Sequence, residues 1–342
     1  MIREIYKNIR KSLSPEMKTS LSKLIFKYSG KPFVKSDRIP LEEKFPNKES
    51  GGMIISADFE LAWAFRYSKS YKEPYKAALS YARQDRINVP KLINLFEIYN
   101  IPITWATVGH LFLKECKNGD HDWMNRIQHF ENKNWEFKKG DWFDFDPYTN
   151  FKENSEWYAP DLIEMILKSK IPHEISTHTF SHIDFSNKNC SPLVADDEIV
   201  ACIKAMKPFG LTPKSIVFPG GTYGNIPILK KHGIQIYRKN VNVDLAYPYF
   251  DEYGLLVSPT TTGFGRSHQG WSAEYYVHRF KTFIDKAIDT GTIAHFWFHP
   301  SFDEWTLQNV MAPVLKYASQ RREQKMLWIG TMYDISKFIN KL

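Results

Sequence analysis

Cysteine is scarce in this chain of 342 residues. Cys116, Cys190 and Cys202 lie far apart and form no C-x-x-C pair, so neither a disulfide framework nor a zinc ribbon is expected. No stretch approaches the roughly 20 consecutive apolar residues that a membrane-spanning helix requires, and no N-terminal apolar run resembles a secretory signal peptide. We therefore expect a cytoplasmic protein.

Basic residues are unevenly distributed. The net charge is +8, and residues 1–30 alone carry seven Lys or Arg against two Glu. Apolar residues of this segment recur near helical spacing, and Pro15 divides it into two short helices with Ser14 as N-cap of the second. Such a segment suits either peripheral contact with the anionic inner face of a membrane or packing against the rest of the chain. No nucleic-acid-binding motif accompanies the charge, so no nucleic-acid partner is expected.

The chain divides into an extension and one domain. Residues 34–52 are polar, contain two prolines and end in Gly-Gly, which is typical of a linker. We therefore expect a basic, helical N-terminal extension over residues 1–49 and a single domain over 50–342.

Strand-like and helical patterns alternate in the domain, which predicts an α/β fold with a parallel sheet. Eight candidate strands favour a barrel over an open sheet. The strand candidates are 53–57, 103–108, 174–178, 215–219, 234–238, 255–258, 292–299 and 326–332. The helix candidates are 90–99, 159–168, 196–206, 227–232, 273–289 and 304–322. Residues 117–157 show no clear period and are expected to form a long insertion over one face.

Two carboxylates follow the first apolar strand. In MIISADFE, Asp58 and Glu60 are two positions apart, so both side chains point to the same side of a strand. Acidic residues at the C-terminal end of a barrel strand lie where such folds place their chemistry. Two carboxylates on one face repel each other unless a cation or a shared proton intervenes. A structural cap for the following loop is the alternative explanation.

A histidine pair follows a later strand. His178 and His182 are four positions apart, directly after the strand candidate 174–178. This spacing brings two imidazoles to one side, as metal chelation requires. The pair would lie at the same edge of the sheet as Asp58 and Glu60, which indicates a divalent metal site.

These motifs resemble those of the polysaccharide deacetylases of carbohydrate esterase family four, the NodB homology domain. The run from His178 to His182 matches the family's H-[ST]-x-x-H motif at every defined position, and SADFE resembles a divergent form of its first motif, T-F-D-D. TWATVGHLF at 104–112 is similar to the family's A-T-F-F-V-x-G strand, and FWFHP at 296–300 to its C-terminal L-x-L-H motif. The resemblance covers about residues 50–340 and implies a distorted (β/α) barrel of the NodB type.

The resemblance also implies a reaction. His178, His182 and Glu60 would bind a divalent metal, for which Zn²⁺ is the leading candidate. Asp58 would be the general base and His299 the general acid, although Asp58 and Glu60 could exchange roles. The expected activity is removal of an N-acyl group from an amino sugar, with acetyl as the leading candidate for that group. Because no export signal is present, a lipid- or nucleotide-linked saccharide is the expected substrate. Further substrate contacts are expected from Trp63, Arg66, Tyr223 and His295. The mouth of the barrel, where the substrate would enter, could also include His110, Asp184 and Asp303.

One motif departs from the family. Its third motif, R-x-P-[YF], supplies an arginine that orients the base, whereas residues 215–225 keep the proline and a Tyr-Gly turn without an arginine. Arg238 or Arg66 could substitute. This departure leaves two alternatives open, namely another metal-dependent amide or formamide hydrolase on the same scaffold and a catalytically silent saccharide-binding protein.

Overall fold

The computed structural model describes residues 13–29, 32–136, 142–265 and 271–341. Ten strands form one sheet in the order β6-β7-β5-β4-β3-β2-β1-β9-β8, and β10 pairs with the first half of β1. All pairs are parallel except β6 with β7. The strands are β1 (Gly51–Phe59), β2 (Thr104–Thr107), β3 (Glu174–Thr177), β4 (Ser215–Val217), β5 (Ile236–Lys239), β6 (Tyr249–Phe250), β7 (Leu256–Pro259), β8 (Thr262–Gly263), β9 (Ile293–Phe298) and β10 (Leu327–Gly330).

The segment from β7 to β8 links the two sides of this sheet. β7 pairs with β5, whereas β8, two residues further on, pairs with β9 near the opposite end of the row. The side chain of Ser258 on β7 also lies 2.8 Å from Nδ1 of His295 on β9. The sheet is therefore strongly curled, and the predicted distorted barrel is confirmed, with all eight predicted strands present.

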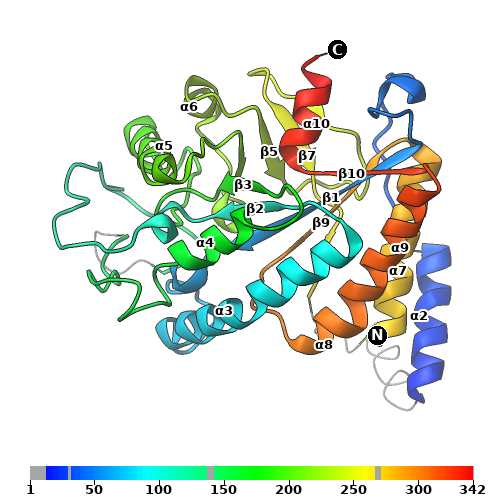
Figure 1. The fold of residues 1–342 in the computed structure, drawn as a ribbon, viewed down its shortest axis with the longest axis horizontal. Coiled ribbons are helices and arrows are strands. Elements are labelled where there is room, and N and C mark those ends of the chain that lie inside the picture. Colours follow the sequence, from blue (N-terminus) through cyan, green and yellow to red (C-terminus); the bar gives the residue numbers. More distant parts are fainter. Residues whose placement is uncertain (1–12, 30–31, 137–141, 266–270, 342) are drawn as a thin grey trace.

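Helices surround the sheet, with α3, α7 and α9 below it and α5 and α6 above it in the view of Figure 1. The helices are α2 (Pro15–Ser29), α3 (Pro74–Tyr99), α4 (Pro160–Leu167), α5 (Pro192–Met206), α6 (Ile226–Lys231), α7 (Ala273–Thr290), α8 (Glu304–Thr306), α9 (Ala312–Glu323) and α10 (Met332–Ile339).

Two helices begin earlier than predicted. α3 begins at Pro74 and continues through Pro90. The buried positions of its first half are Ala78, Ala82 and Asp85, which carry little of the hydrophobic periodicity that identifies a helix. α5 begins after Ser191, whose hydroxyl accepts a hydrogen bond from the amide of Val194, and not at the acidic residues from 196 onwards.

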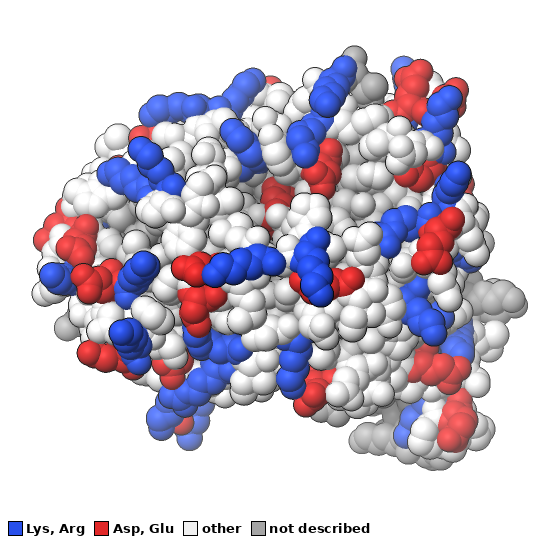
Figure 2. Space-filling model, in the orientation of Figure 1, with Lys and Arg blue, Asp and Glu red and all other residues white. Residues whose placement is uncertain are grey.

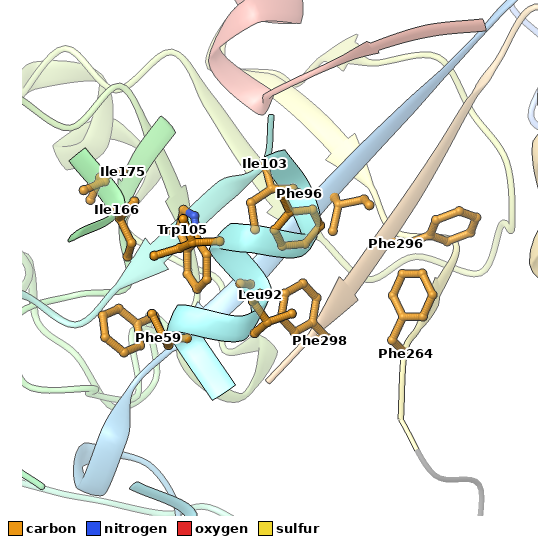
Figure 3. Packing of buried hydrophobic residues seen from close by; sticks show 14 of the residues in the cluster. Phe59, Leu92, Phe96, Ile103, Trp105, Ile166, Ile175, Phe264, Phe296 and Phe298 are labelled. Carbon is orange, nitrogen blue, oxygen red and sulfur yellow. The ribbon is translucent and has the colours of Figure 1, made fainter. Parts of the chain in front are cut away.

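Aromatic side chains hold the strands around the candidate site in a rigid core (Figure 3). Phe59 at the end of β1 packs edge-on against Trp105 of β2, with ring centroids 6.0 Å apart. Phe298 of β9 packs against Phe96 of α3 at 6.3 Å. All four side chains are fully buried, and each such burial contributes on the order of 2–3 kcal/mol. Phe59 thus packs the end of β1 against β2, Phe298 packs the end of β9 against α3, and β1 and β9 pair directly with each other.

The predicted linker packs against the barrel. Phe45 is fully buried and lies between the rings of Tyr247 and Trp328. Gly51 already belongs to β1, and a Cβ atom there would lie 2.5 Å from the backbone of Ala287 in α7. The Gly-Gly pair thus permits a close approach of strand and helix, and the prediction of a linker ending at these glycines was wrong.

The second predicted N-terminal helix is present as α2. The hydroxyl of Ser14 accepts a hydrogen bond from the amide of Met17, and Phe26 packs against Tyr275 and Phe283 of α7. Met17 and Leu24 are 56% and 53% exposed. The first predicted helix falls largely on residues 1–12, outside the described residues. Among the helices of the described part, none combines the length and apolar character of a membrane span.

Candidate active site and metal centre

Five predicted residues converge at the C-terminal edge of the parallel strands. Asp58 lies at the end of β1 and Glu60 directly follows this strand. His178 follows β3 and His299 follows β9, while His182 lies on the loop after His178. The first three and His182 are buried, whereas the side chain of His299 is 32% exposed. Because β1 lies between β2 and β9, these strand ends meet at one edge of the sheet.

Glu60 lies between the two histidines. Its Oε1 atom is 2.8 Å from Nε2 of His178 and 3.2 Å from Nε2 of His182. The candidate ligand atoms of these three residues all lie within 4.8 Å of one another. Two imidazoles and one carboxylate form a ligand set that zinc uses in catalytic sites, with a further position left for water or substrate.

The tautomer of His178 is set by its second nitrogen. Nδ1 lies 2.7 Å from the carbonyl oxygen of Val217 on β4, and because a carbonyl can only accept, Nδ1 carries the proton. In the neutral ring Nε2 is then unprotonated, and its lone pair faces the carboxylate of Glu60. Two acceptors at this distance require either a second proton on His178 or a cation between them, and a divalent metal meets that requirement.

The charge states of the other two ligands also suit a metal. Burial alone would raise the pKa of Glu60, but the nearby imidazoles of His299 and His182 and the close contacts with His178 and His182 hold this pKa well below its ordinary value. Burial lowers the pKa of His182, against the opposing charge of Glu60. An ionised carboxylate and a neutral imidazole at neutral pH are the forms that coordinate a metal.

The loop that carries the histidines has an unusual backbone. Thr179 and His182 have φ values of 60° and 55°, a conformation that costs energy for residues with a side chain. The carboxylate of Glu198 on α5 accepts hydrogen bonds from the amides of Phe180 and Ser181 and from the Ser181 hydroxyl, at 2.8, 3.0 and 2.6 Å. Glu198 therefore supports the loop.

Asp58 is held by an arginine from another strand. Nη1 and Nη2 of Arg238 on β5 donate to Oδ1 and Oδ2 of Asp58 at 2.5 and 2.7 Å. Nη1 also donates to the hydroxyl of Ser56. Of the two arginines considered as replacements in the third motif, Arg238 makes this contact. Arg66 is instead buried and donates to the carbonyl oxygens of Trp63, Trp142 and Ser181.

His299 faces both carboxylates from β9. Its Nε2 atom is 3.6 Å from Oε2 of Glu60 and 4.0 Å from Oδ2 of Asp58. The rings of Phe65 and Trp297 each lie 5.6 Å from the imidazole, centroid to centroid. The partial exposure of His299 makes it accessible to a substrate that approaches Asp58 and Glu60.

Three of the four predicted substrate contacts are wrong. Trp63, Arg66 and His295 are 0%, 1% and 0% exposed and therefore have no surface to offer. Trp63 packs against His110 and Trp157, and His295 lies inside the barrel between the hydroxyls of Ser56 and Ser258. Tyr223 is 46% exposed, with the ammonium of Lys239 3.7 Å from its ring centroid.

The other residues considered for the mouth have structural contacts. The Asp303 side chain caps α8 by accepting from the amide of Thr306, Asp184 accepts from Asn132, Asn189 and Ser186, and His110 lies in a separate buried cluster.

Half-buried aromatic side chains border the site and were not predicted. Trp135, from the long insertion, has its ring centroid 5.5 Å from that of His182, and its indole covers Gly220 on the turn after β4. Phe65 and Trp297 flank His299. Because Phe65 and Trp135 come from separate loops and Trp297 comes from β9, only the tertiary structure shows that they border one site.

Comparison with known proteins gives a family match over part of the chain. The sequence profile of the family described as "Polysaccharide deacetylase" matches residues 72–237, a range that includes the histidine pair but neither Asp58, Glu60 nor His299. No curated protein matches the chain at a significant level.

Solved structures show the same fold at low identity. A structure described as a polysaccharide deacetylase from Mycobacterium smegmatis aligns with a TM-score of 0.63 and 13% identity over 90% of this chain and 95% of its own. Another so described, from Pseudomonas aeruginosa PAO1, aligns with a TM-score of 0.62 and 14% identity over 89% and 95%. A structure described as PuuE allantoinase aligns with a TM-score of 0.60 and 13% identity over 90% and 95%.

The family match over the second motif, the curled parallel sheet and the histidine–carboxylate site at its edge agree with the resemblance of the sequence motifs. Residues 72–237 therefore match the polysaccharide deacetylase family, and the fold is the one found in solved structures described as polysaccharide deacetylases.

Proposed function

We propose that this protein is a metal-dependent hydrolase that removes an N-acyl group from an amino sugar, with acetyl as the preferred candidate for that group. The observation that carries the proposal is the convergence of Glu60, His178 and His182, in which the lone pair of His178 Nε2 faces the Glu60 carboxylate at 2.8 Å. Zn²⁺ is the first choice because two imidazoles and one carboxylate match its ligand preference.

The side chains of the site divide the chemistry between them. Glu60, His178 and His182 would hold the ion, which when bound lowers the pKa of water and polarises a carbonyl oxygen. Asp58, with both oxygens fixed by Arg238, is the proton acceptor. The partly exposed imidazole of His299 is the proton donor for the leaving amine. It reaches into the site from the end of β9, the strand that pairs with β1.

The rim favours a saccharide. Phe65, Trp135 and Trp297 surround His182 and His299 with partly exposed aromatic faces. Flat apolar rings against which one face of a pyranose can pack are suited to sugar binding, while Asp58, Glu60 and His299 offer hydrogen-bond partners for its polar groups.

A lipid- or nucleotide-linked saccharide at the inner face of a membrane remains the proposed form of the substrate. Met17 and Leu24 project from α2 with more than half of their surface exposed, on a helix that also carries basic residues. On the face shown in Figure 2, basic and acidic side chains are interspersed and form no extended basic patch.

A second candidate is hydrolysis of a different C–N bond. The fold of PuuE allantoinase resembles this chain almost as closely as do those of the two deacetylases, and fold does not decide substrate. A silent binding protein is less well supported, because Arg238 makes the contact to Asp58 that the missing motif-three arginine would have made.

Release of acetate and formate from acylated amino sugars tests the proposal. Free, nucleotide-linked, lipid-linked and polymeric N-acetyl sugars should be compared with allantoin, before and after chelation and re-addition of Zn²⁺. His178→Ala should abolish turnover, whereas His232→Ala, a histidine paired with Asp196 between α5 and α6, should not. Turnover of allantoin alone would support the second candidate, and full activity of His178→Ala would refute both.

A further inference from the structure

Four metal-binding side chains meet in a second buried cluster outside the candidate active site. His110 lies on the short helix η3 (Gly109–Phe112) directly after β2, and Cys116, His121 and Asp146 lie on the long connection that follows. We propose that these four side chains bind a structural Zn²⁺ ion that orders this connection.

The spacing of the candidate ligand atoms fits a tetrahedral ion. All four atoms lie within 4.8 Å of one another. Sγ of Cys116 is 2.9 Å from Nε2 of His121, while Oδ2 of Asp146 is 3.0 Å from Nε2 of His110 and 3.7 Å from Nε2 of His121. Zinc bonds of about 2.0–2.3 Å place tetrahedral ligand atoms roughly 3.3–3.8 Å apart. Small side-chain adjustments would therefore complete the site.

Two of these atoms are buried without a hydrogen bond. His110 Nε2 and Asp146 Oδ2 face each other, but neither makes a hydrogen bond of acceptable geometry. Leaving such groups unpaired inside a protein costs free energy, because they lose their hydrogen bonds to water. A cation between them removes that cost, and it also explains why a carboxylate, two imidazoles and a thiol gather where water is excluded.

The surroundings orient the ligands toward one point. The other oxygen of Asp146, Oδ1, accepts from the amide of Tyr148 at 3.0 Å and from the hydroxyl of Tyr158 at 3.3 Å, which leaves Oδ2 directed into the cluster. The imidazole of His121 stacks on Phe143 with centroids 4.5 Å apart and an interplanar angle of 22°. Partners of this kind, which hold a ligand without touching the ion, are a regular part of protein metal sites.

The ligand set indicates a structural ion. All four side chains are buried, and one sulfur, two nitrogens and one oxygen complete a tetrahedron without an open position for substrate. His121 lines a surface pocket together with Asp120 and Trp123, which provides a route for the ion to enter.

The position of the ion explains what it would do. Between Leu113 and Ala159 the described residues form no helix and only isolated bridges, and irregular segments of this length are uncommon in compact domains. One ion would tie both ends of the connection to the end of β2. The same connection carries Trp135, which reaches His182, so its order bears on the mouth of the candidate active site.

Cobalt substitution of the full-length protein tests this proposal independently of catalysis. The candidate active site contains no sulfur, so a sulfur-to-Co²⁺ charge-transfer band in the near ultraviolet reports on Cys116 alone. We expect this band in the Co²⁺ protein, and a sulfur neighbour at about 2.3 Å in X-ray absorption spectra of the Zn²⁺ protein. Absence of both signals from the unaltered protein would overturn the proposal.

Variants assign the signal and keep the two sites apart. Cys116→Ser should abolish the band and lose one equivalent of bound zinc. Cys190→Ser, at another buried free thiol, should retain both band and ion, and His182→Ala should lose the active-site equivalent while keeping the band. A band that survives Cys116→Ser would contradict the assignment. If the proposed catalytic metal were wrong, the protein would still bind one ion with the sulfur band.

Discussion

Arg238 on β5 donates to both carboxylate oxygens of Asp58 on β1, at 2.5 and 2.7 Å. The third motif, on β4, lacks the arginine expected there, and the guanidinium arrives instead from the next strand of the sheet. The orientation of Asp58 is thus preserved by a residue at an unexpected position in the sequence.

Arg238→Lys should lower kcat while leaving bound metal unchanged. A lysine ammonium cannot make the two parallel hydrogen bonds of a guanidinium, so Asp58 loses its fixed orientation, and a misplaced catalytic group costs on the order of 10²-fold in rate. Steady-state kinetics with metal analysis checks this. Loss of the metal together with activity would show that Arg238 acts on the ligands and not on Asp58.

Asp58→Asn and Glu60→Gln should separate the two roles that the sequence left open. Asp58→Asn removes the proton acceptor and should reduce kcat by about 10²–10⁴-fold with metal retained. Glu60→Gln should weaken metal binding, because Glu60 is the acid within 3.2 Å of both histidines. Isothermal titration of the apo variants with Zn²⁺, beside activity, measures both effects. The reverse pattern would exchange the roles.

His299→Ala should affect substrates according to their leaving groups. An amine must be protonated as it leaves, so the loss for an N-acetyl sugar should reach about 10²–10⁴-fold. An activated aryl ester leaves without protonation and should be hydrolysed at a nearly unchanged rate. Equal losses of kcat/KM on both substrates would argue that His299 positions the substrate and does not donate a proton.

Asp85→Asn should make stability less dependent on pH. Asp85 is buried in α3, and burial followed by the negative charge of Glu60 raises its pKa well above the ordinary value. Between the unfolded pKa, about 3.9, and this raised value, the folded protein binds more protons than the unfolded chain, so the free energy of unfolding falls as pH rises.

The amide mimics the protonated acid and removes this slope. The gain at neutral pH should be about 1.4 kcal/mol for each unit by which the pKa is raised. Urea denaturation between pH 4 and pH 8 measures it. An equal slope in the wild type and in Asp85→Asn would show that Asp85 titrates normally.

A double substitution of Met17 and Leu24 by glutamate tests membrane contact. Both side chains are more than half exposed on α2, whereas Phe26 faces α7, so the change should leave packing intact and weaken binding to anionic vesicles. Flotation of full-length proteins measures the difference. Ile87→Glu on the exposed face of α3 serves as the control, and equal flotation of all three proteins would end the membrane hypothesis.

Much of the fold could be predicted from local patterns. The eight strands stand out because apolar runs alternate with helical periods, and His178 and His182 stand out because their spacing and flanks match a known motif. The order of motifs along the chain also placed Asp58, Glu60 and His299 at the ends of strands.

Other features depend on contacts between distant segments. Trp63, Arg66 and His295 follow or belong to motifs and were expected to touch substrate, but burial directs them into packing. Arg238, Glu198 and Trp135 reach the site from other elements, and no local pattern links them to it.

The sequence by itself determined the strand edge at which the chemistry gathers, because parallel strands align their C-terminal ends whatever lies between them. Only the tertiary structure decided which arginine holds Asp58 and which scattered histidine, cysteine and aspartate side chains meet around a second point. These contacts depend on how the loops fold over the sheet. The side chains involved are separated by tens of residues, and no regular spacing in the sequence indicates that they meet.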